Sequence, residues 1–196
     1  MLALTTAGWA QKSGLSAREG HARTRFPLSV WTDPFDDDYE WVVERVVEDW
    51  NTLTREVLDV QAFVLLPWRD RADVTIAIGL RVSVLGAAGI TKIRAGTDRE
   101  LVRPVQIILF GPPGAENGPP AIDREACLYR VIAHELGHAL GLSHVDDLRS
   151  VMCCVHWPTD GLNRLTLWEA RKRPDVHSVR DQLAGHCAVF WAMDVP

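Results

Sequence analysis

The sequence predicts a domain of the α+β class. Three observations lead to this class: a strand-like segment precedes a long amphipathic helix, several short apolar segments follow in mid-chain, and helical periodicity returns in the last third. With 196 residues, the chain suits one domain that can bury a substantial core. It contains no internal repeat and no low-complexity segment.

The first half of the chain alternates between strand and helix signals. Phe26–Asp33 alternates apolar and polar residues and predicts a strand, and the acidic run Asp36–Asp38 predicts a helix-capping turn. The helix over Asp38–Leu58 has one apolar stripe, made of Tyr39, Val42, Val43, Val46, Trp50, Leu53 and Val57. Gln61–Trp68 predicts a short buried strand, and Ala72–Gly79 predicts another by its alternation.

The middle of the chain returns to strand and loop signals. The stretch 80–94 indicates a loop that leads into an edge strand, and Pro104–Gly111 predicts a clear strand. Residues 112–120, with the sequence PPGAENGPP, have the composition of a loop. These segments complete the strands that the predicted sheet requires.

Helical signals dominate the last third. A second helix is predicted from Ile122, with Asp123 as N-cap and Gly141 as C-cap; its apolar face consists of Leu128, Val131, Ile132, Leu136, Ala139 and Leu140. Leu165–Arg173 predicts a third helix that Pro174 ends. We expect the last segment, Asp175–Pro196, to pack against the body through Val179, Leu183, Val189, Phe190 and Trp191.

Charge and composition narrow the classes of partner. The net charge of −5 argues against nucleic acid or an anionic membrane as the main partner, and no apolar run is long enough to span a bilayer. Residues 1–23 are polar and aperiodic and predict an N-terminal tail or the remnant of an export signal. We expect a monomer that is secreted or otherwise extracytoplasmic. Residues 1–23 match an export signal only weakly, which leaves a cytoplasmic location open.

The four cysteines do not form a CxxC pair or a zinc-finger spacing. Two interpretations remain open. Cys127, Cys153, Cys154 and Cys187 are either buried thiols that act as small hydrophobic groups, or Cys187 forms a disulfide with the turn at 153–154.

The segment HELGHALGLSH, from His134 to His144, carries the chemistry. His134 and His138 lie four residues apart on the predicted helix, so both imidazoles leave the same face. Gly141 permits a left-handed turn at low cost, and the turn allows His144 to return to the same point. We expect the three imidazoles to bind one metal ion.

The donor set indicates the metal and its role. Three neutral nitrogens suit zinc and leave its fourth position open, which is typical of a catalytic site. The pKa of a water at that position falls to about 7. Glu135, next to the first ligand, can take the proton of that water as a general base.

The segment matches the metzincin signature HExxHxxGxxH at every fixed position. Metzincins also carry a methionine in a tight turn beneath the zinc, and Met152 in SVM fits that place. The order of the surrounding segments is most similar to the matrixins, over about residues 24–173. The resemblance implies a zinc endopeptidase with a twisted mixed sheet, two long helices and a small C-terminal subdomain, divided at about 24–143 and 144–196.

The resemblance also implies how a peptide would bind. An antiparallel edge strand within 82–94 would receive the peptide substrate in extended conformation. The pocket for the substrate side chain beyond the scissile bond would be walled by Val155, His156, Trp157 and Pro158. His156 could instead lie on the surface, and we expect His21, His177 and His186 to be structural or exposed.

The chain departs from many animal matrixins. Residues 80–103 contain no histidine and one aspartate, so we expect no second, structural zinc, and calcium binding has no support beyond the acidic run. Two rival functions stay open: a zinc-binding recognition module that no longer cleaves, and a hydrolase of a non-peptide bond. The intact Glu135 favours a peptidase over a binding module.

Overall fold

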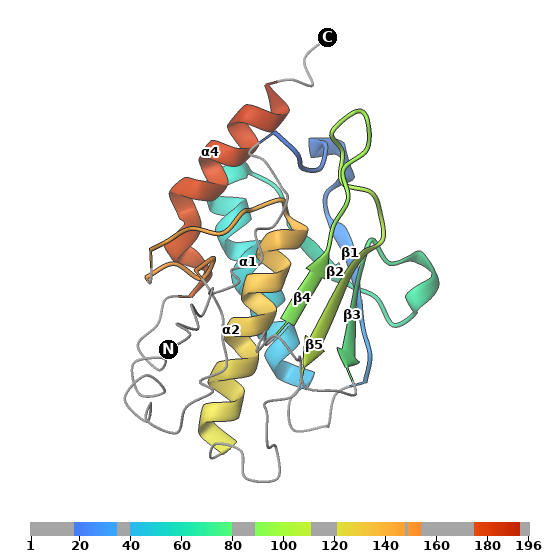
Figure 1. Cartoon of the computed structure of the whole chain (residues 1–196), viewed down its shortest axis with the longest axis vertical. Coiled ribbons are helices and arrows are strands. Elements are labelled where there is room, and N and C mark those ends of the chain that lie inside the picture. Colours follow the sequence, from blue (N-terminus) through green and yellow to red (C-terminus); the bar gives the residue numbers. More distant parts are fainter. Residues whose placement is uncertain are drawn as a thin grey trace, which may run out of the picture.

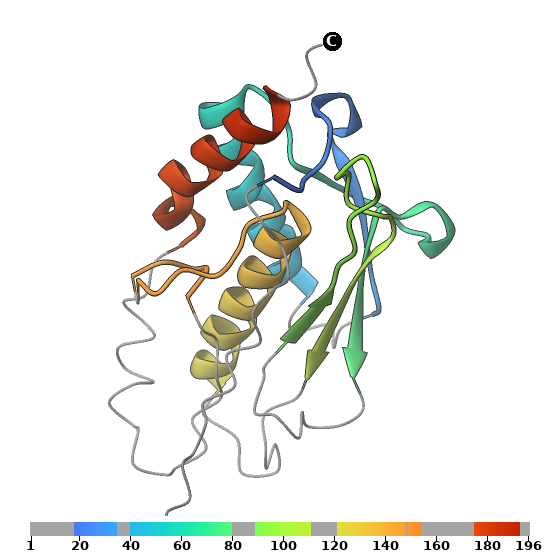
Figure 2. The same ribbon diagram turned by 45° about the horizontal axis from the view of Figure 1, so that its top comes forward.

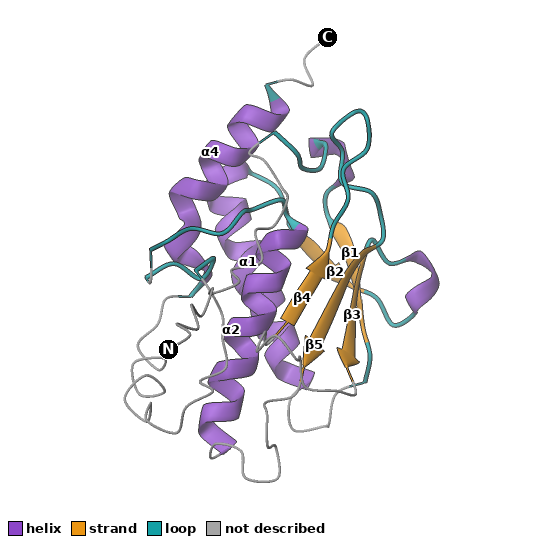
Figure 3. Ribbon diagram, viewed as in Figure 1, coloured by secondary structure: helices purple, strands orange, loops and turns teal. Residues whose placement is uncertain are grey.

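The computed structural model has a sheet on one side and helices on the other (Figures 1 and 3). It describes residues 18–34, 40–79, 89–110, 121–147, 149–153 and 175–192. The strands are β1 (Leu28–Thr32), β2 (Phe63–Leu65), β3 (Val74–Gly79), β4 (Gly89–Lys92) and β5 (Val105–Phe110). The α-helices are α1 (Glu40–Leu58), α2 (Ala121–Ala139) and α4 (Arg180–Trp191), with 3-10 turns at Arg23–Arg25, Arg69–Arg71 and Val176–Val179.

The five strands form one mixed sheet in the order β2-β1-β3-β5-β4. The pairs β1–β2, β1–β3 and β3–β5 are parallel. β4 runs antiparallel to β5, with Thr91 opposite Ile107. The expected mixed sheet with an antiparallel edge strand within 82–94 is therefore confirmed, and it is that strand which lies nearest to α2 (Figures 1 and 2).

The core lies between the sheet and helices α1 and α2. It consists of apolar side chains that are almost fully buried, among them Val30, Ile76, Ile107, Trp50, Leu53, Ile132 and Leu136. The indole N–H of Trp50 donates a hydrogen bond of 3.2 Å to the carbonyl oxygen of Ala133, which ties α1 to α2. Each large side chain buried here contributes about 1.5–3 kcal/mol. The core thereby fixes α2, the helix that carries the histidine motif, against the sheet.

β2 corrects a sequence prediction. We expected a buried strand over Gln61–Trp68, but β2 is short and lies at the edge of the sheet, paired only with β1 among the described strands. Phe63 is buried, whereas Val64 is 37% and Leu65 36% exposed. The buried Asn51 of α1 holds the strand in place, because its amide group bonds both the N–H and the carbonyl of Phe63.

Both ends of the helical part differ from prediction. α2 begins at Ala121, so Asp123 lies inside the helix and not at its N-cap. The C-terminal segment forms a helix that the sequence did not predict, α4. Its buried residues Leu183 and Phe190 lie seven positions apart, which places them two turns apart on one face of the helix. The expected packing of this segment against the body is confirmed except at Val189, whose side chain is 45% exposed.

Several expectations fall outside the described residues: the acidic run Asp36–Asp38, the loop 112–120, the helix Leu165–Arg173 and the pocket residues Val155, His156, Trp157 and Pro158. Cys154 lies there too. Cys187 is a buried free thiol, so the disulfide interpretation is wrong and the hydrophobic one holds for this residue. Burial raises the pKa of the Cys187 thiol to about 12.

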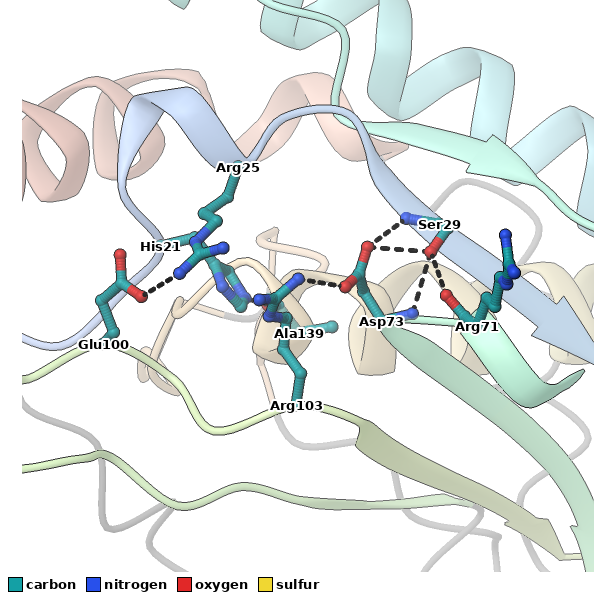
Figure 4. A network of polar contacts seen from close by, with 8 residues as sticks. All are labelled: His21, Arg25, Ser29, Arg71, Asp73, Glu100, Arg103 and Ala139. Carbon is teal, nitrogen blue, oxygen red and sulfur yellow. Dashed lines mark hydrogen bonds and ion pairs between the residues drawn. The ribbon is translucent and has the colours of Figure 1, made fainter.

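Polar contacts join the N-terminal part of the chain to the sheet and to α2 (Figure 4). Asp73, just before β3, accepts hydrogen bonds of 2.9 and 2.8 Å from the backbone N–H and hydroxyl of Ser29 in β1, and it pairs with Arg103. Burial acts to raise the pKa of Asp73, but these hydrogen bonds hold it below its ordinary value. The carboxylate thus fixes the neighbouring starts of β1 and β3.

Candidate metal centre and active site

Three histidine side chains converge at the C-terminal end of α2. The Nε2 atoms of His134 and His138 are 3.1 Å apart, and each lies 3.0 Å from Nε2 of His144. His134 and His138 are 3% and 5% exposed. The structure therefore brings together the three residues that the spacing predicted, and they form the only metal-capable cluster found among the described residues.

Backbone carbonyls fix the orientation of two of the rings. Nδ1–H of His134 donates to the carbonyl of Val151 at 2.8 Å, and Nδ1–H of His138 donates to the carbonyl of Leu142 at 2.7 Å. A carbonyl can only accept, so the proton of each neutral ring lies on Nδ1. Burial lowers the pKa of His134 to about 3 and that of His138 to about 4. Both rings are thus neutral at physiological pH and present lone pairs at Nε2.

This donor set fits zinc. The Nε2 lone pairs of His134 and His138 face one another at 3.1 Å, and they repel unless a cation lies between them. Two nitrogens bound at about 2.1 Å and at a tetrahedral angle lie about 3.4 Å apart, close to the spacing observed. Three imidazole nitrogens also leave one position of a tetrahedral ion without a protein ligand.

The turn after α2 explains how His144 reaches the cluster. Gly141 has φ of +99°, the left-handed conformation that a helix C-cap requires. The N–H of Leu142 bonds the carbonyl of Gly137 at 3.0 Å, and the N–H of Gly141 bonds that of His138 at 2.9 Å. These two bonds define a Schellman motif, which ends the helix and redirects the chain. The predicted role of Gly141 is confirmed.

Replacing Gly141 by alanine should destabilise the protein. A β-carbon there would lie 2.9 Å from the carbonyl oxygen of Glu19 and 2.7 Å from His186 Nε2, in addition to the strain of positive φ. We expect Gly141→Ala to lower the free energy of unfolding in urea by about 1–3 kcal/mol. Gly185→Ala is the matched control: Gly185 is an exposed residue of α4 with no atom within 4 Å of its missing β-carbon, so alanine should stabilise by about 0.5–1 kcal/mol. Equal stability of both variants would contradict this role for the turn.

Met152 lies directly beneath the helix. The side chain is fully buried, and its sulfur occupies the space that a β-carbon at Gly137 would need. The carbonyl of Met152 accepts a hydrogen bond of 3.3 Å from the N–H of Val145, next to His144. The turn at 149–153 therefore supports the motif at two points: Met152 from below, and the Val151 carbonyl through the His134 ring.

Glu135 points toward the edge strand of the sheet. It is 4% exposed, and its carboxylate accepts a short hydrogen bond from the hydroxyl of Thr91 in β4. Burial raises the pKa of Glu135 to about 7, although the hydrogen bond from Thr91 acts in the opposite direction. A buried carboxyl of this kind can exchange a proton near neutral pH. Sequence reasoning missed Thr91, since no local signal links it to a residue 44 positions away.

Two further buried histidines, His21 and His186, lie close to the turn at Gly141. His21 Nε2–H donates to the carbonyl of Ala139 at 2.9 Å, and the indole N–H of Trp191 donates to the carbonyl of His21 at 2.9 Å. Burial lowers the pKa of both His21 and His186. The N-terminal segment thus lies between the end of α2 and α4, and His21 and His186 have structural positions, as expected. His177 lies exposed near Asp175.

Comparison with known families decides the class of this site. A family model described as Matrixin, of the peptidase M10 group, matches residues 22–167. The chain belongs to the matrixin family. The match covers close to the range that the resemblance suggested and includes the three histidines, Glu135 and Met152. This matrixin is therefore a metalloendopeptidase-type domain with an intact histidine triad.

Two further comparisons add no functional assignment. The crystal structure of archaemetzincin from Methanopyrus kandleri is similar to this matrixin with a TM-score of 0.48 and 14% sequence identity. The similarity covers 82% of this chain and 96% of that one. No curated protein matches the chain.

Proposed function

We propose that the protein is a zinc-dependent endopeptidase in which His134, His138 and His144 hold one zinc ion and Glu135 is the general base. One observation supports this most strongly: three Nε2 atoms converge at 3.0–3.1 Å in a chain of the matrixin family, and the residue next to His134, Glu135, carries a buried carboxylate. A bound zinc ion supplies a Lewis acid for the scissile carbonyl and lowers the pKa of its water to about 7.

The side chains of the protein supply the proton transfer. Glu135 is poorly hydrated because it is buried, and a poorly hydrated carboxylate is a stronger base than one on the surface. It takes a proton from the attacking water and delivers it to the leaving amine, so that the same group acts first as base and then as acid. The carbonyls of Val151 and Leu142 keep the rings of His134 and His138 in position, and Met152 packs against Gly137 of the same helix.

The substrate would be a peptide in extended conformation. Within the described part of the chain, β4 pairs only with β5, so its outer edge is available to an added strand. Peptide substrates are those that the family implies. No helix among the described residues is long and apolar enough to cross a membrane. Matrixins are typically secreted, which favours an extracytoplasmic location for a protein that cleaves proteins or peptides.

Cleavage of a peptide library tests this proposal. We expect the zinc-loaded protein to cut internal peptide bonds, and 1,10-phenanthroline to abolish the activity until zinc is restored. Mass spectrometry of the products then gives the cleavage sites. A protein with one zinc per chain that cuts neither the library nor unfolded casein would instead favour the zinc-binding recognition module.

A further inference from the structure

Two residues of the edge strand β4, Gly89 and Thr91, contact the carboxylate of Glu135. Thr91 Oγ1 donates a short hydrogen bond to Glu135 Oε2, and it also lies 3.3 Å from the backbone carbonyl oxygen of Glu135. A β-carbon on Gly89 would lie 2.6 Å from Oε1 of the same carboxylate. One oxygen therefore contacts a hydroxyl, and the other lies against bare backbone.

The register of the sheet places both contacts on one face. Gly89 and Thr91 are two residues apart, so they face the same side of β4. They lie opposite Leu109 and Ile107 of β5, which are buried beneath the helices. Figures 1 and 2 show α2 running alongside β4. Both contacts to the Glu135 carboxylate thus come from a strand of the sheet and not from a loop.

The arrangement restricts a side chain that would otherwise be mobile. Glutamate has three rotatable bonds, and a base that samples several rotamers spends little time in the productive one. Thr91 and Gly89, which contact the carboxylate, both lie outside the histidine cluster. The β-branched Thr91 itself has restricted rotamers in a strand, which makes it a firm donor.

We propose that Thr91 is a positioning residue: its hydroxyl, together with the bare backbone at Gly89, holds the Glu135 carboxylate in the orientation needed for proton transfer. The inference rests on the proposed function, since it acts through the general base assigned there. It also connects the two halves of the reaction, because the strand that would receive the peptide is the strand that orients the base.

Two variants of Thr91 separate the hydroxyl from the shape of the side chain. Thr91→Val keeps the β-branched shape and removes the donor; we expect kcat to fall by about 10–100-fold, with KM within about twofold of wild type. Thr91→Ser restores the donor and should recover most of kcat. Thr75→Val is the matched control, since it removes another strand hydroxyl two strands away, on β3, and should leave kcat unchanged.

Two readouts distinguish positioning from a loss of structure. Zinc affinity of Thr91→Val, measured by competition with a chromophoric chelator, should equal that of wild type, and a crystal structure of the zinc-loaded variant should show the Glu135 carboxylate turned away from β4. In the Glu135→Gln background, Thr91→Val should cause no further loss of kcat, because the group it positions is already absent.

The outcomes divide cleanly. If wild type cleaves peptides, Glu135→Gln does not, and Thr91→Val retains full kcat, then the Thr91 inference is wrong and the proposed function stands. Equal losses in Thr91→Val and Thr91→Ser would also overturn the inference, because the hydroxyl would then not be the cause. If zinc-loaded wild type cleaves nothing, the proposed function fails and the inference fails with it.

Discussion

Glu135→Gln is expected to lower kcat by about 10²–10⁴-fold while zinc binding stays unchanged. The amide has nearly the shape of the carboxylate, and it can still accept a hydrogen bond from Thr91 through its oxygen. It cannot take up a proton at neutral pH. The loss therefore equals the contribution of a general base, which is typically of that size. Steady-state cleavage of a fluorogenic peptide measures it.

The matched control for this variant is Glu48→Gln on α1. Glu48 is an exposed residue that pairs with Arg55 at 3.1 Å, and a surface pair of this kind contributes little. We expect its kcat to equal that of wild type. Full activity of Glu135→Gln, with zinc bound, would remove Glu135 from the role of base and leave the zinc alone to explain any cleavage.

The second large effect is expected on zinc binding. His138→Ala removes one of three converging nitrogens and also the hydrogen bond from its ring to the carbonyl of Leu142. Loss of an outer contact to a ligand already lowers metal affinity or activity by 10–100-fold, so loss of the ligand itself should weaken zinc binding by more than about 100-fold. Peptide cleavage should fall to background. Titration of the apo protein with zinc against a competing chelator gives the affinity.

His177→Ala provides the comparison for that experiment. His177 is exposed at the start of the C-terminal segment and lies outside the histidine cluster, so its removal should not change zinc affinity. A His138→Ala protein that binds zinc as tightly as wild type would show that the ion is held elsewhere.

The sequence predicted the centre of the site because its determinants are local. His134, Glu135 and His138 share one helix, so the helical repeat alone places their side chains. Gly141 follows within one turn, and a glycine at that place predicts the left-handed cap that the structure shows. These are interactions between residues at most ten positions apart.

What the sequence missed depends on contacts between distant segments. Thr91 meets Glu135 only because β4 lies beside α2, and nothing near Thr91 indicates that pairing. The short apolar run at Phe63–Leu65 has the composition of a buried strand, and its edge position follows from the strand order. The apolar residues of the C-terminal segment do not recur regularly enough at helical spacings of three and four to predict α4.

The zinc coordination of the wild-type protein tests the central claim most directly. The protein should be loaded with one equivalent of zinc and studied by X-ray absorption and by anomalous diffraction at the zinc edge. The account predicts one ion per chain with three imidazole nitrogens from His134, His138 and His144 and one oxygen from solvent. A fourth protein ligand on the ion, or an ion bound away from these histidines, would contradict it.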